Sequence, residues 1–429
     1  MNLFKNISTL VCIDNQKQLF KFGKDMNNIN VIEDGAIVFD DKFRFVGTTN
    51  DAYKFIADNQ LNIKNTKSLF GKTIVPGFVD SHTHIVFAGD RSEEFGKRLA
   101  GASYKEIAQS GGGIQTTVRA TRNASIEQLT KNGIKLLESA IGYGTTTIEI
   151  KSGYSLDFEG EIKQLKAIQN IKHILNDNDL DINVISTFMG AHDFPVEYKN
   201  STEGREKYIK IITDEMLPYI VENNLADYCD IFIDEGYFTN ADAEKIFDKS
   251  LSLGLPIKAH CDELANVEAA GYSSNKGAVS VDHLLYISDE SIKSLYKNQT
   301  VANLLPGTAY FIRLPYAPAR KLIESNVIVS LATDCNPGSC YTENMQFIMN
   351  LAAINMNMSA EECLTAATLN SAYSLRLSDK VGSIEVEKKA DFLVLDIDNY
   401  LDLFYHFGVN HIQDVYISGI IFNGFIEIN

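Results

Sequence analysis

The sequence predicts an α/β protein, with a (β/α)8 TIM-like barrel over residues 73–384 and a small β-sandwich domain built from residues 1–72 and 385–429. Two observations predict this fold class. Strand-like and helix-like segments alternate through the middle of the chain, which is the pattern of a parallel sheet covered by helices. Both ends are instead rich in short apolar and β-branched runs, so we expect them to pair with each other.

The N-terminal 70 residues are expected to hold strands and turns. "LFKNISTLVCI" is a strand-like run, and "GAIVFDDKFRFVG" is typical of a hairpin. The C-terminal runs "ADFLVLDID" and "VYISGIIFNGFIEIN" have the same character. These segments predict one composite domain contributed by the two chain ends.

The middle of the chain contains eight strand-like segments: "KTIVPGFVDSH", "TTTIEIKSGY", "INVISTFMGAH", "CDIFIDEGYF", "PIKAHCDE", "VSVDHLL", "VANLLPG" and "VIVSLATDC". Helix-like segments lie between most of them. In "SIEQLTKNGIKLLESAIGYG", apolar residues recur at helical spacing, and two glycines follow as stop signals. Eight such units predict a closed barrel.

Composition limits the function classes. The chain of 429 residues is 45% hydrophobic and 22% charged, as in ordinary globular proteins. A formal net charge of -17 argues against binding to nucleic acid or an anionic membrane, although one buried arginine could still hold an anionic substrate. The start resembles no signal peptide, no run approaches the length of a membrane span, and no cysteines form a CxxC pair. We therefore expect a cytoplasmic protein.

Polar residues that could do chemistry follow the predicted strands, where each strand ends. They are His82, His84, Lys151, His192, Glu235, His260, His283 and Asp334. The carboxyl ends of the strands form the active-site face of such a barrel. We therefore expect these side chains to meet at its mouth.

The segment "DSHTH" places His82 and His84 two residues apart after an apolar run. Side chains two apart on a strand point the same way, and two neutral imidazoles suit a divalent metal. The alternative is a pair of surface histidines in a loop. His260 and Asp334 also follow apolar runs and would complete the ligand set. Three histidines and a carboxylate predict one divalent ion, Zn or Fe, a choice that the ligands leave open.

Three residues are candidates for catalysis. Glu263 lies three residues after His260 and could relay protons, unless it is an acid at a helix N-terminus. His283 could orient water and stabilise an oxyanion, unless it is a core histidine. Asp334 could bind the metal and also accept the proton of the attacking water.

The motifs resemble those of a known family. "VPGFVDSHTH", "AHCDE", "VDH" and "ATDCNPGS" resemble the amidohydrolase superfamily. "HTHIVFAGDRSEEF", "GGGIQTTVRATR", "EIKSGYSLD", "FMGAHDFP" and "DIFIDEGYF" look like the imidazolonepropionases of histidine degradation, and the resemblance runs from about residue 70 to 380. It implies hydrolysis of the ring C–N bond of 4-imidazolone-5-propanoate to N-formimidoyl-L-glutamate. It also implies the metal ligands and the catalytic residues named above.

The resemblance implies substrate contacts from seven residues: Arg91, Tyr154, His192, Glu263, Asn336, Gly338 and Ser339. The guanidinium of Arg91 suits the propionate of the substrate, and the Tyr154 hydroxyl could donate to the same anion. The alternatives are a surface ion pair for the arginine and a packed ring for the tyrosine. The three glycines Gly111–Gly113 are compatible with a mobile lid and with a plain turn.

Two rival functions share the motifs. A deaminase of the same superfamily acting on a purine or pyrimidine would use the same metal set, but a neutral base needs no carboxylate-binding group. A non-catalytic scaffold on the same barrel would lack metal ligands, whereas here all are present.

Lys151 raises a further alternative, because some superfamily members carboxylate a strand-end lysine to bridge two metals. We expect one metal here, a small anionic substrate as partner, and a homodimer, the commonest assembly.

Overall fold

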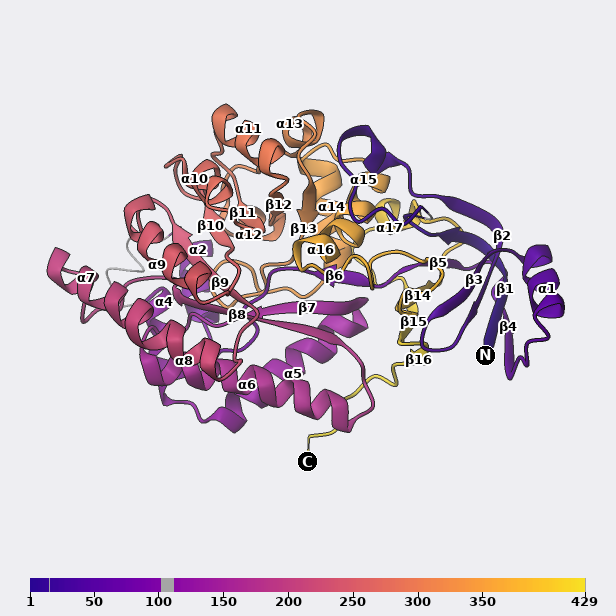
Figure 1. Cartoon of the computed structure of the whole chain (residues 1–429), viewed down its shortest axis with the longest axis horizontal. Helices are drawn as coiled ribbons and strands as arrows, with labels where there is room; N and C mark the ends of the chain where they lie inside the picture. The colour runs from indigo at the N-terminus through magenta and orange to yellow at the C-terminus, as the bar shows by residue number, and fades with distance from the viewer. Residues whose placement is uncertain (15, 102–111, 429) are drawn as a thin grey trace.

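The computed structural model describes residues 1–14, 16–101 and 112–428, which form two eight-stranded sheets (Figure 1). One is a parallel barrel, which confirms the predicted (β/α)8 fold, and the other combines strands from both chain ends. The barrel strands follow in sequence order: β6 (Phe78–Asp80), β7 (Thr145–Lys151), β8 (Asn183–Ala191), β9 (Tyr228–Ile233), β10 (Ala259–Cys261), β11 (Ser280–His283), β12 (Val301–Leu304) and β13 (Val329–Leu331). Each predicted segment of the middle region overlaps one of them, and only β9 begins outside its segment, one residue earlier.

The first and last strands close the barrel beyond their own ends. Thr83 and Cys335 form an isolated parallel bridge. The backbone N–H of Asp334 donates to the His82 carbonyl at 3.0 Å, and that of His84 donates to the Cys335 carbonyl at 2.9 Å. The closure therefore joins "SHTH" to "ATDC" at the mouth, and brings distant polar residues together.

Helices cover the outside of the barrel (Figure 1). Those described are α2 (Ser92–Leu99), α4 (Ile114–Asn123), α5 (Ile126–Gly142), α6 (Phe158–Asp177), α7 (Thr202–Lys210), the π-helical turn η2 (Ile211–Met216), α8 (Leu217–Glu222), α9 (Asn240–Ser252), α10 (Ala269–Asn275), α11 (Asp289–Asn298), α12 (Pro306–Ile312), α13 (Ala319–Glu324), α14 (Met345–Asn355), α15 (Ala360–Ala366) and α16 (Leu369–Ser374). Helices α7 and α8 are joined without a break through η2. None of the described helices is long and apolar enough to cross a membrane.

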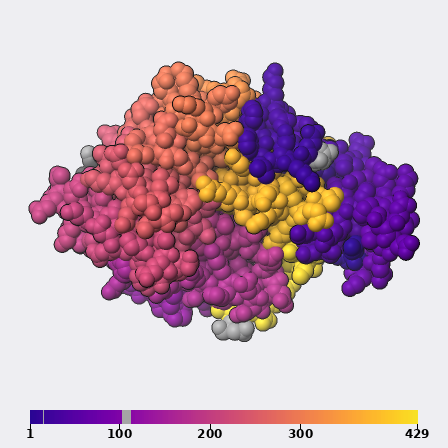
Figure 2. All heavy atoms as spheres, in the orientation of Figure 1, coloured from indigo at the N-terminus to yellow at the C-terminus, as the bar shows by residue number. Residues whose placement is uncertain are grey.

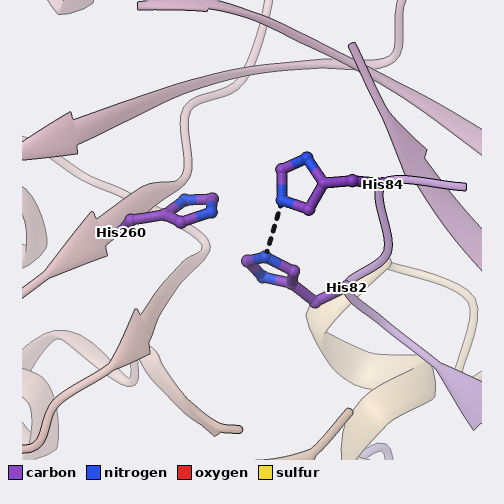
Figure 3. A group of neighbouring side chains, drawn as sticks. All are labelled: His82, His84 and His260. Atoms are coloured by element: carbon purple, nitrogen blue, oxygen red, sulfur yellow. Dashed lines mark hydrogen bonds between the residues drawn. The ribbon is translucent and has the colours of Figure 1, made fainter. Parts of the chain in front are cut away.

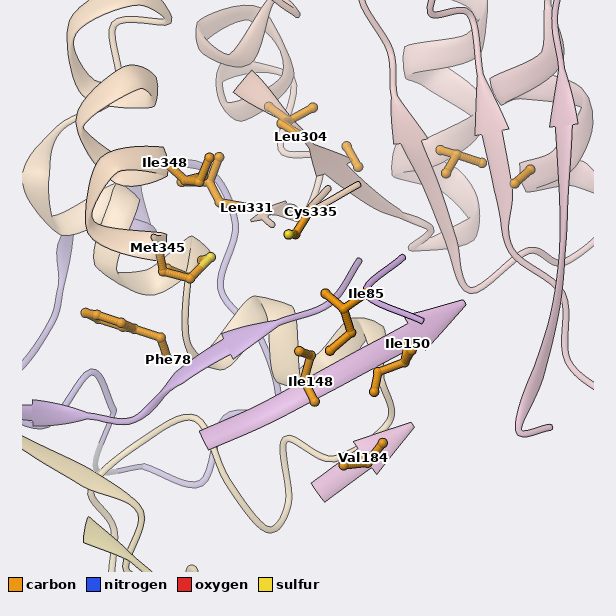
Figure 4. Packing of buried hydrophobic residues seen from close by; sticks show 14 of the residues in the cluster. Phe78, Ile85, Ile148, Ile150, Val184, Leu304, Leu331, Cys335, Met345 and Ile348 are labelled. Carbon is orange, nitrogen blue, oxygen red and sulfur yellow. The ribbon is translucent and has the colours of Figure 1, made fainter. Parts of the chain in front are cut away.

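Helix α5 shows how the local sequence sets an element. The Ser125 hydroxyl accepts from the Gln128 N–H and caps its start. The predicted apolar face is buried against the barrel, in the same core as the strand residues of Figure 4. After the helix ends, Gly144 takes a φ of +98°, and a Cβ there would lie 2.7 Å from the Leu393 and Ile412 side chains. Glycine is thus required both for the turn and for close packing against the second sheet.

The second sheet, here called the terminal sheet, joins the chain ends, whose indigo and yellow surfaces adjoin in Figure 2. It contains β1 (Asn2–Val11), β2 (Val31–Phe39), β3 (Phe43–Thr48), β4 (Asn65–Ser68), β5 (Thr73–Pro76), β14 (Phe392–Leu395), β15 (Ile412–Ile417) and β16 (Ile420–Ile421). The expected hairpin is the antiparallel pair β2 and β3. Strand β5 pairs with β1 and β14, although the predicted boundary at 72/73 falls just before it. The division into two domains stays a prediction.

The prediction of strands and turns alone over the first 70 residues is wrong, because helix α1 (Thr49–Asp58) lies there, together with the short 3-10 helix η1 (Gly23–Asn27). Near the other end lies α17 (Asp402–Tyr405). Thr48 caps α1 by accepting from the Asp51 N–H. Ala52 is buried with residues of β1 and β2, and the Phe55 ring lies 5.1 Å from that of Phe45. A cap and tertiary packing therefore stabilise a helix of only ten residues, a length that is marginal in isolation.

Candidate active site

His82 and His84 follow β6 and point the same way, as their spacing predicts (Figure 3). Their Nε2 atoms are 3.3 Å apart, and both side chains are buried. His260, in β10, faces them across the barrel mouth, with its ring centroid 4.5 Å from that of His82. One ligand atom from each of the three lies within 4.8 Å of the others.

Asp334 joins this cluster from the loop after β13. Its Oδ1 lies 3.4 Å from His82 Nε2 and 3.8 Å from His84 Nε2. Its Oδ2 accepts from the hydroxyl of Thr308 at the start of α12. The hydroxyl holds the carboxylate in place, so one oxygen is left to face the histidines. All four predicted ligands therefore converge.

Carboxylates behind the histidines set which ring nitrogen faces the cluster. His82 Nδ1 lies 2.6 Å from Asp282 Oδ2, and His260 Nδ1 lies 3.1 Å from Asp230 Oδ1. Each carboxylate accepts a hydrogen bond from a protonated Nδ1, which leaves the Nε2 lone pair free. The His260 Nε2 has no partner among the described residues and is buried. An unpartnered buried nitrogen of this kind is costly unless it receives a ligand.

Burial keeps the imidazoles of His82 and His84 neutral. Burial, then Lys151 and the neighbouring histidines, lowers the pKa of His82 well below its usual range. Burial and then His192 lower the pKa of His84 in the same way. For Asp334, burial outweighs the hydrogen bond from Thr308 and raises the pKa to about 6. Neutral imidazoles beside one carboxylate form a donor set that attracts a cation.

Glu263 and His283 lie beside the cluster, with Glu263 Oε2 3.8 Å from His283 Nε2. Burial, then the charges of Asp334 and Asp234, raises the pKa of Glu263 well above its usual range. A carboxyl with a raised pKa can both donate and accept a proton near neutrality. Burial and then His260 lower the pKa of His283, which is therefore neutral.

Several strand-end residues of the site have strained backbone. His283 and Leu284 have φ of 76° and 65°, and Asp334 has φ of 54°. Non-glycine residues rarely adopt this left-handed region, at a cost of about 1–3 kcal/mol each. Such strain persists where surrounding packing over-determines it and is concentrated at functional sites, which agrees with the position of these residues.

A cavity of about 470 Å³ opens beside the cluster. It is lined by all seven predicted substrate-binding residues: Arg91, Tyr154, His192, Glu263, Asn336, Gly338 and Ser339. Apolar and aromatic side chains, including Phe95, Phe232 and Phe311, complete its wall. An apolar wall with a few convergent polar groups is typical of a site for one small molecule.

Arg91 stands at the start of α2, with its side chain largely buried. Its Nε donates to Glu94 Oε2 at 2.9 Å, so the surface ion pair considered as an alternative is instead a buried one. A Cβ on Gly338 would lie 2.1 Å from an Arg91 terminal nitrogen. Glycine at 338 is therefore what allows the guanidinium to lie flat against this loop.

Tyr154 and His192 form the side of the cavity nearest the histidine cluster. The His192 ring stacks on that of His84, with centroids 5.2 Å apart, and lies 5.2 Å from the Tyr154 ring. Its Nδ1 donates to the Gly153 carbonyl at 3.0 Å, which leaves Nε2 as an acceptor. Burial, then His260, lowers the pKa of His192 to about 3.

The loop after β13 is organised by Asn336. Its Oδ1 accepts from the Gly338 and Ser339 N–H groups at 2.8 Å, and its Nδ2 donates to the Asp334 carbonyl at 2.7 Å. These bonds occupy both ends of the Asn336 amide. Asn336 therefore shapes the loop that presents Asp334 and Gly338 to the cavity.

One strand-end candidate lies apart from the site. Glu235 is exposed and outside the lining of the cavity, because β9 ends at Ile233 and the chain turns outward after Asp234. The prediction that it belongs with the others is wrong. Asp234 instead accepts from the Glu263 and Leu264 N–H groups at 2.7 and 2.8 Å, and holds that segment in place.

Several contributing residues were not predicted. Arg98 lines the cavity and donates to the Gly338 carbonyl at 3.3 Å. Arg98 lies seven residues after Arg91, which is two turns of a helix, so both side chains fall on the same helical face. This spacing could have indicated that Arg98 also faces the cavity. Asp230, Asp282 and Thr308 carry no comparable signal. The Gly111–Gly113 prediction falls partly outside the described residues, since Gly111 is among residues 102–111.

Comparison with known proteins agrees with this geometry. The amidohydrolase family matches residues 73–421. An imidazolonepropionase from Clostridium tetani is 42% identical over 400 residues, 93% of each chain, and one from Desulfotalea psychrophila is 44% identical over 81% of this chain and 82% of its own. Among solved structures, a zinc-bound adenosine deaminase from Xanthomonas campestris is similar over 98% of this chain and 92% of its own, with a TM-score of 0.69 and 18% identity. A guanine deaminase from C. acetobutylicum aligns over 98% and 99%, with a TM-score of 0.64 and 18% identity. The solved structures support the fold.

Proposed function

This chain belongs to the amidohydrolase family and, within it, to the imidazolonepropionases, and from that premise we propose how it hydrolyses the ring C–N bond of 4-imidazolone-5-propanoate to N-formimidoyl-L-glutamate. The observation that carries the proposal is that two groups adjoin. The cavity that Arg91 lines is also lined by His192, whose ring stacks on that of His84 in the cluster of three histidines and Asp334. The substrate needs both, because it combines a hydrolysable ring with a carboxylate.

We propose that His82, His84, His260 and Asp334 bind one divalent ion, zinc or iron. Two atoms that would bind one ion at about 2.0–2.1 Å must lie within about 4.2 Å of each other. The separations of His82 Nε2 from His84 Nε2 and from Asp334 Oδ1 are 3.3 and 3.4 Å, so they are short enough for a shared ion. When bound, such an ion acts as a Lewis acid and lowers the pKa of a coordinated water from about 15.7 toward about 7.

The side chains of the cavity orient the substrate. The Arg91 guanidinium and the Tyr154 hydroxyl bind the propionate and direct the ring toward the histidines. His192 packs along the ring as a neutral acceptor, and the aromatic wall excludes water. Asn336, Gly338 and Ser339 contact substrate or product from the loop after β13.

The catalytic side chains handle charge and protons. His283 donates a hydrogen bond to the carbonyl oxygen as negative charge develops on it. Asp334 accepts the proton of the attacking water, and Glu263 delivers a proton to the ring nitrogen as the C–N bond opens. The raised pKa of Glu263 suits this step, because its carboxyl then holds a proton near neutral pH.

The alternative, deamination of a purine or pyrimidine, is not favoured. The fold and the metal ligands are compatible with it, but a neutral base carries no anionic group for the Arg91 guanidinium, whose Nε pairs with Glu94 while the rest of the guanidinium lines a largely apolar cavity. A homodimer and a cytoplasmic location stay predictions.

A direct assay tests the proposal. Purified protein is assayed with 4-imidazolone-5-propanoate, guanine, cytosine and adenosine, before and after treatment with a chelator, and its metal content is measured. We expect turnover of the imidazolone alone, loss on chelation, recovery with Zn²⁺ or Fe²⁺, and about one metal per chain. Faster deamination of a base, or full activity without metal, would reject the proposal.

A further inference from the structure

We propose that Lys151 is a positioning residue for the metal ligands, acting through two carboxylates that it bridges. It is the last residue of β7, and its side chain is fully buried. Its Nζ lies 2.7 Å from Asp230 Oδ2 and 3.8 Å from Asp282 Oδ2, and 2.9 Å from Glu149 Oε2. The inference rests on the proposed metal site, and concerns what holds that site in shape.

The two bridged carboxylates are those that hold the histidines. Asp230 contacts Lys151 through Oδ2 and His260 through Oδ1, so the carboxylate links the two side chains. Asp282 uses Oδ2 for both His82 Nδ1 and Lys151. One ammonium thus contacts the carboxylates that hold two proposed ligands, His260 in β10 and His82 in the segment after β6. Its position sets where both imidazoles aim Nε2.

The bridge also has an electrostatic role that packing alone could not supply. Asp230, Asp282 and Glu149 are fully buried acids, and only nearby cations make their ionised forms tolerable. Without the ammonium, the carboxylates would repel each other and lose an anchor. Each would then be held less firmly, although Asp282 still accepts from the Ser280 hydroxyl at 3.0 Å. The histidine ring beside each carboxylate would in turn be less fixed in its tautomer and direction.

The same surroundings disfavour the carboxylated lysine that bridges two metals in some amidohydrolases. A carbamate at Lys151 would place a negative charge among three acids that now attract a positive one. The group of Asp230, His260 and Asp282 has a geometry that could hold a cation. The Lys151 ammonium already lies against two of its members, and so serves as the cation of that position.

Lys258 offers a matched control within the same cluster. It is also a fully buried lysine, and its Nζ pairs with Glu149 Oε2 at 2.8 Å and lies 3.3 Å from the Ser81 carbonyl. Its ion pair is therefore to the acid that holds no histidine. Replacing it removes an equally buried charge from the cluster and leaves the links to His82 and His260 in place.

The experiment compares Lys151→Met with Lys258→Met in the full chain. Zn²⁺ affinity is measured on metal-free protein by competition with a chromophoric chelator, together with circular dichroism, thermal unfolding, kcat and KM. We expect Lys151→Met to weaken Zn²⁺ binding about 10- to 100-fold, and to lower kcat at subsaturating metal with little change in KM. Lys258→Met should lower thermal stability while keeping Zn²⁺ affinity within about threefold.

Other outcomes separate the possible failures. Equal Zn²⁺ affinity in folded Lys151→Met and wild type would overturn the inference, as would an equal loss in both variants. Should Lys151→Met not fold, Lys151→Gln, which keeps a donor toward Asp230 without the charge, is measured in its place against the same thresholds. Wild-type protein that binds no Zn²⁺ at all would instead reject the metal site, and with it the proposed function.

Discussion

The barrel mouth and the terminal sheet each contain a buried cluster of side chains. The cluster in the terminal sheet is apolar, whereas the one at the mouth is polar and charged. In the terminal sheet, the rings of Phe4, Phe39 and Phe392 pack edge to face, with centroids 5.0–5.9 Å apart, and Tyr416 stacks on Phe392 at 4.5 Å. The mouth instead buries histidines, carboxylates and lysines. Burying apolar rings is favourable, whereas burying charges costs desolvation that pairing only partly offsets.

This difference separates what holds the molecule together from what performs chemistry. The aromatic cluster joins strands from both chain ends, so its contacts contribute to stability across the longest sequence separation in the fold. The charged cluster contributes little net stability, but it holds ligand atoms at fixed positions. Mutations in the two regions should therefore affect different measurements.

His260→Ala should have the largest effect on activity. The change removes a ligand and leaves Asp230 without its imidazole, so we expect metal binding and turnover to fall to background together. Metal analysis and steady-state kinetics measure both, and thermal unfolding should show a folded protein. His173→Ala, at an unrelated histidine on α6, is the control. Full activity in His260→Ala would remove this residue from the ligand set.

Phe392→Ala should have the converse effect. Phe392 is fully buried and contacts Phe4, Phe39 and Tyr416, so its loss should lower the free energy of unfolding by about 3–5 kcal/mol. Turnover per folded, metal-loaded molecule should stay within about twofold of wild type. Denaturant unfolding measures the first quantity, and Phe407→Ala, at an exposed ring, should change stability far less. A large drop in kcat without loss of stability would contradict the comparison.

Arg91→Ala should act on binding at the mouth. Loss of a charge-assisted contact to the propionate should raise KM about 10- to 100-fold, with a smaller change in kcat and unchanged metal content. Arg44→Ala, which removes an arginine paired with Asp40 and Glu387 at the terminal sheet, should leave KM unaltered. An unchanged KM in Arg91→Ala would place the propionate elsewhere in the cavity.

The smallest predicted effect is a pH dependence of the terminal sheet. Burial, opposed by Lys389, raises the pKa of Asp391 from 3.8 to about 6. The folded state therefore holds this proton more tightly than the unfolded state, so its contribution is complete below about pH 4 and is lost as pH rises toward 6. Asp391→Asn should remove on the order of 1–2 kcal/mol of this dependence. Identical slopes of stability against pH from 4 to 6 in both proteins would reject the assignment.

Much of this arrangement was predictable from local signals. The eight barrel strands and helix α5 follow from apolar runs, helical periodicity and glycine stops. The convergence of His82, His84, His260 and Asp334 follows from their positions after strands, because parallel strands end at one face. Glu235 fits the same rule but lies outside the site, since a chain leaving a strand can turn outward within two residues. Helix α1 escaped prediction because it is short, at ten residues, and lies between segments that are typical of strands.

The sequence by itself determined the barrel, the paired chain ends and the candidate ligands, because strand alternation and strand-end position are encoded over a few neighbouring residues. Only the tertiary structure decided which carboxylate stands behind which histidine, that Lys151 bridges Asp230 and Asp282, and that Gly338 makes room for Arg91. Those relations join residues on different strands. They depend on barrel closure and side-chain direction, which no stretch of neighbouring residues specifies alone.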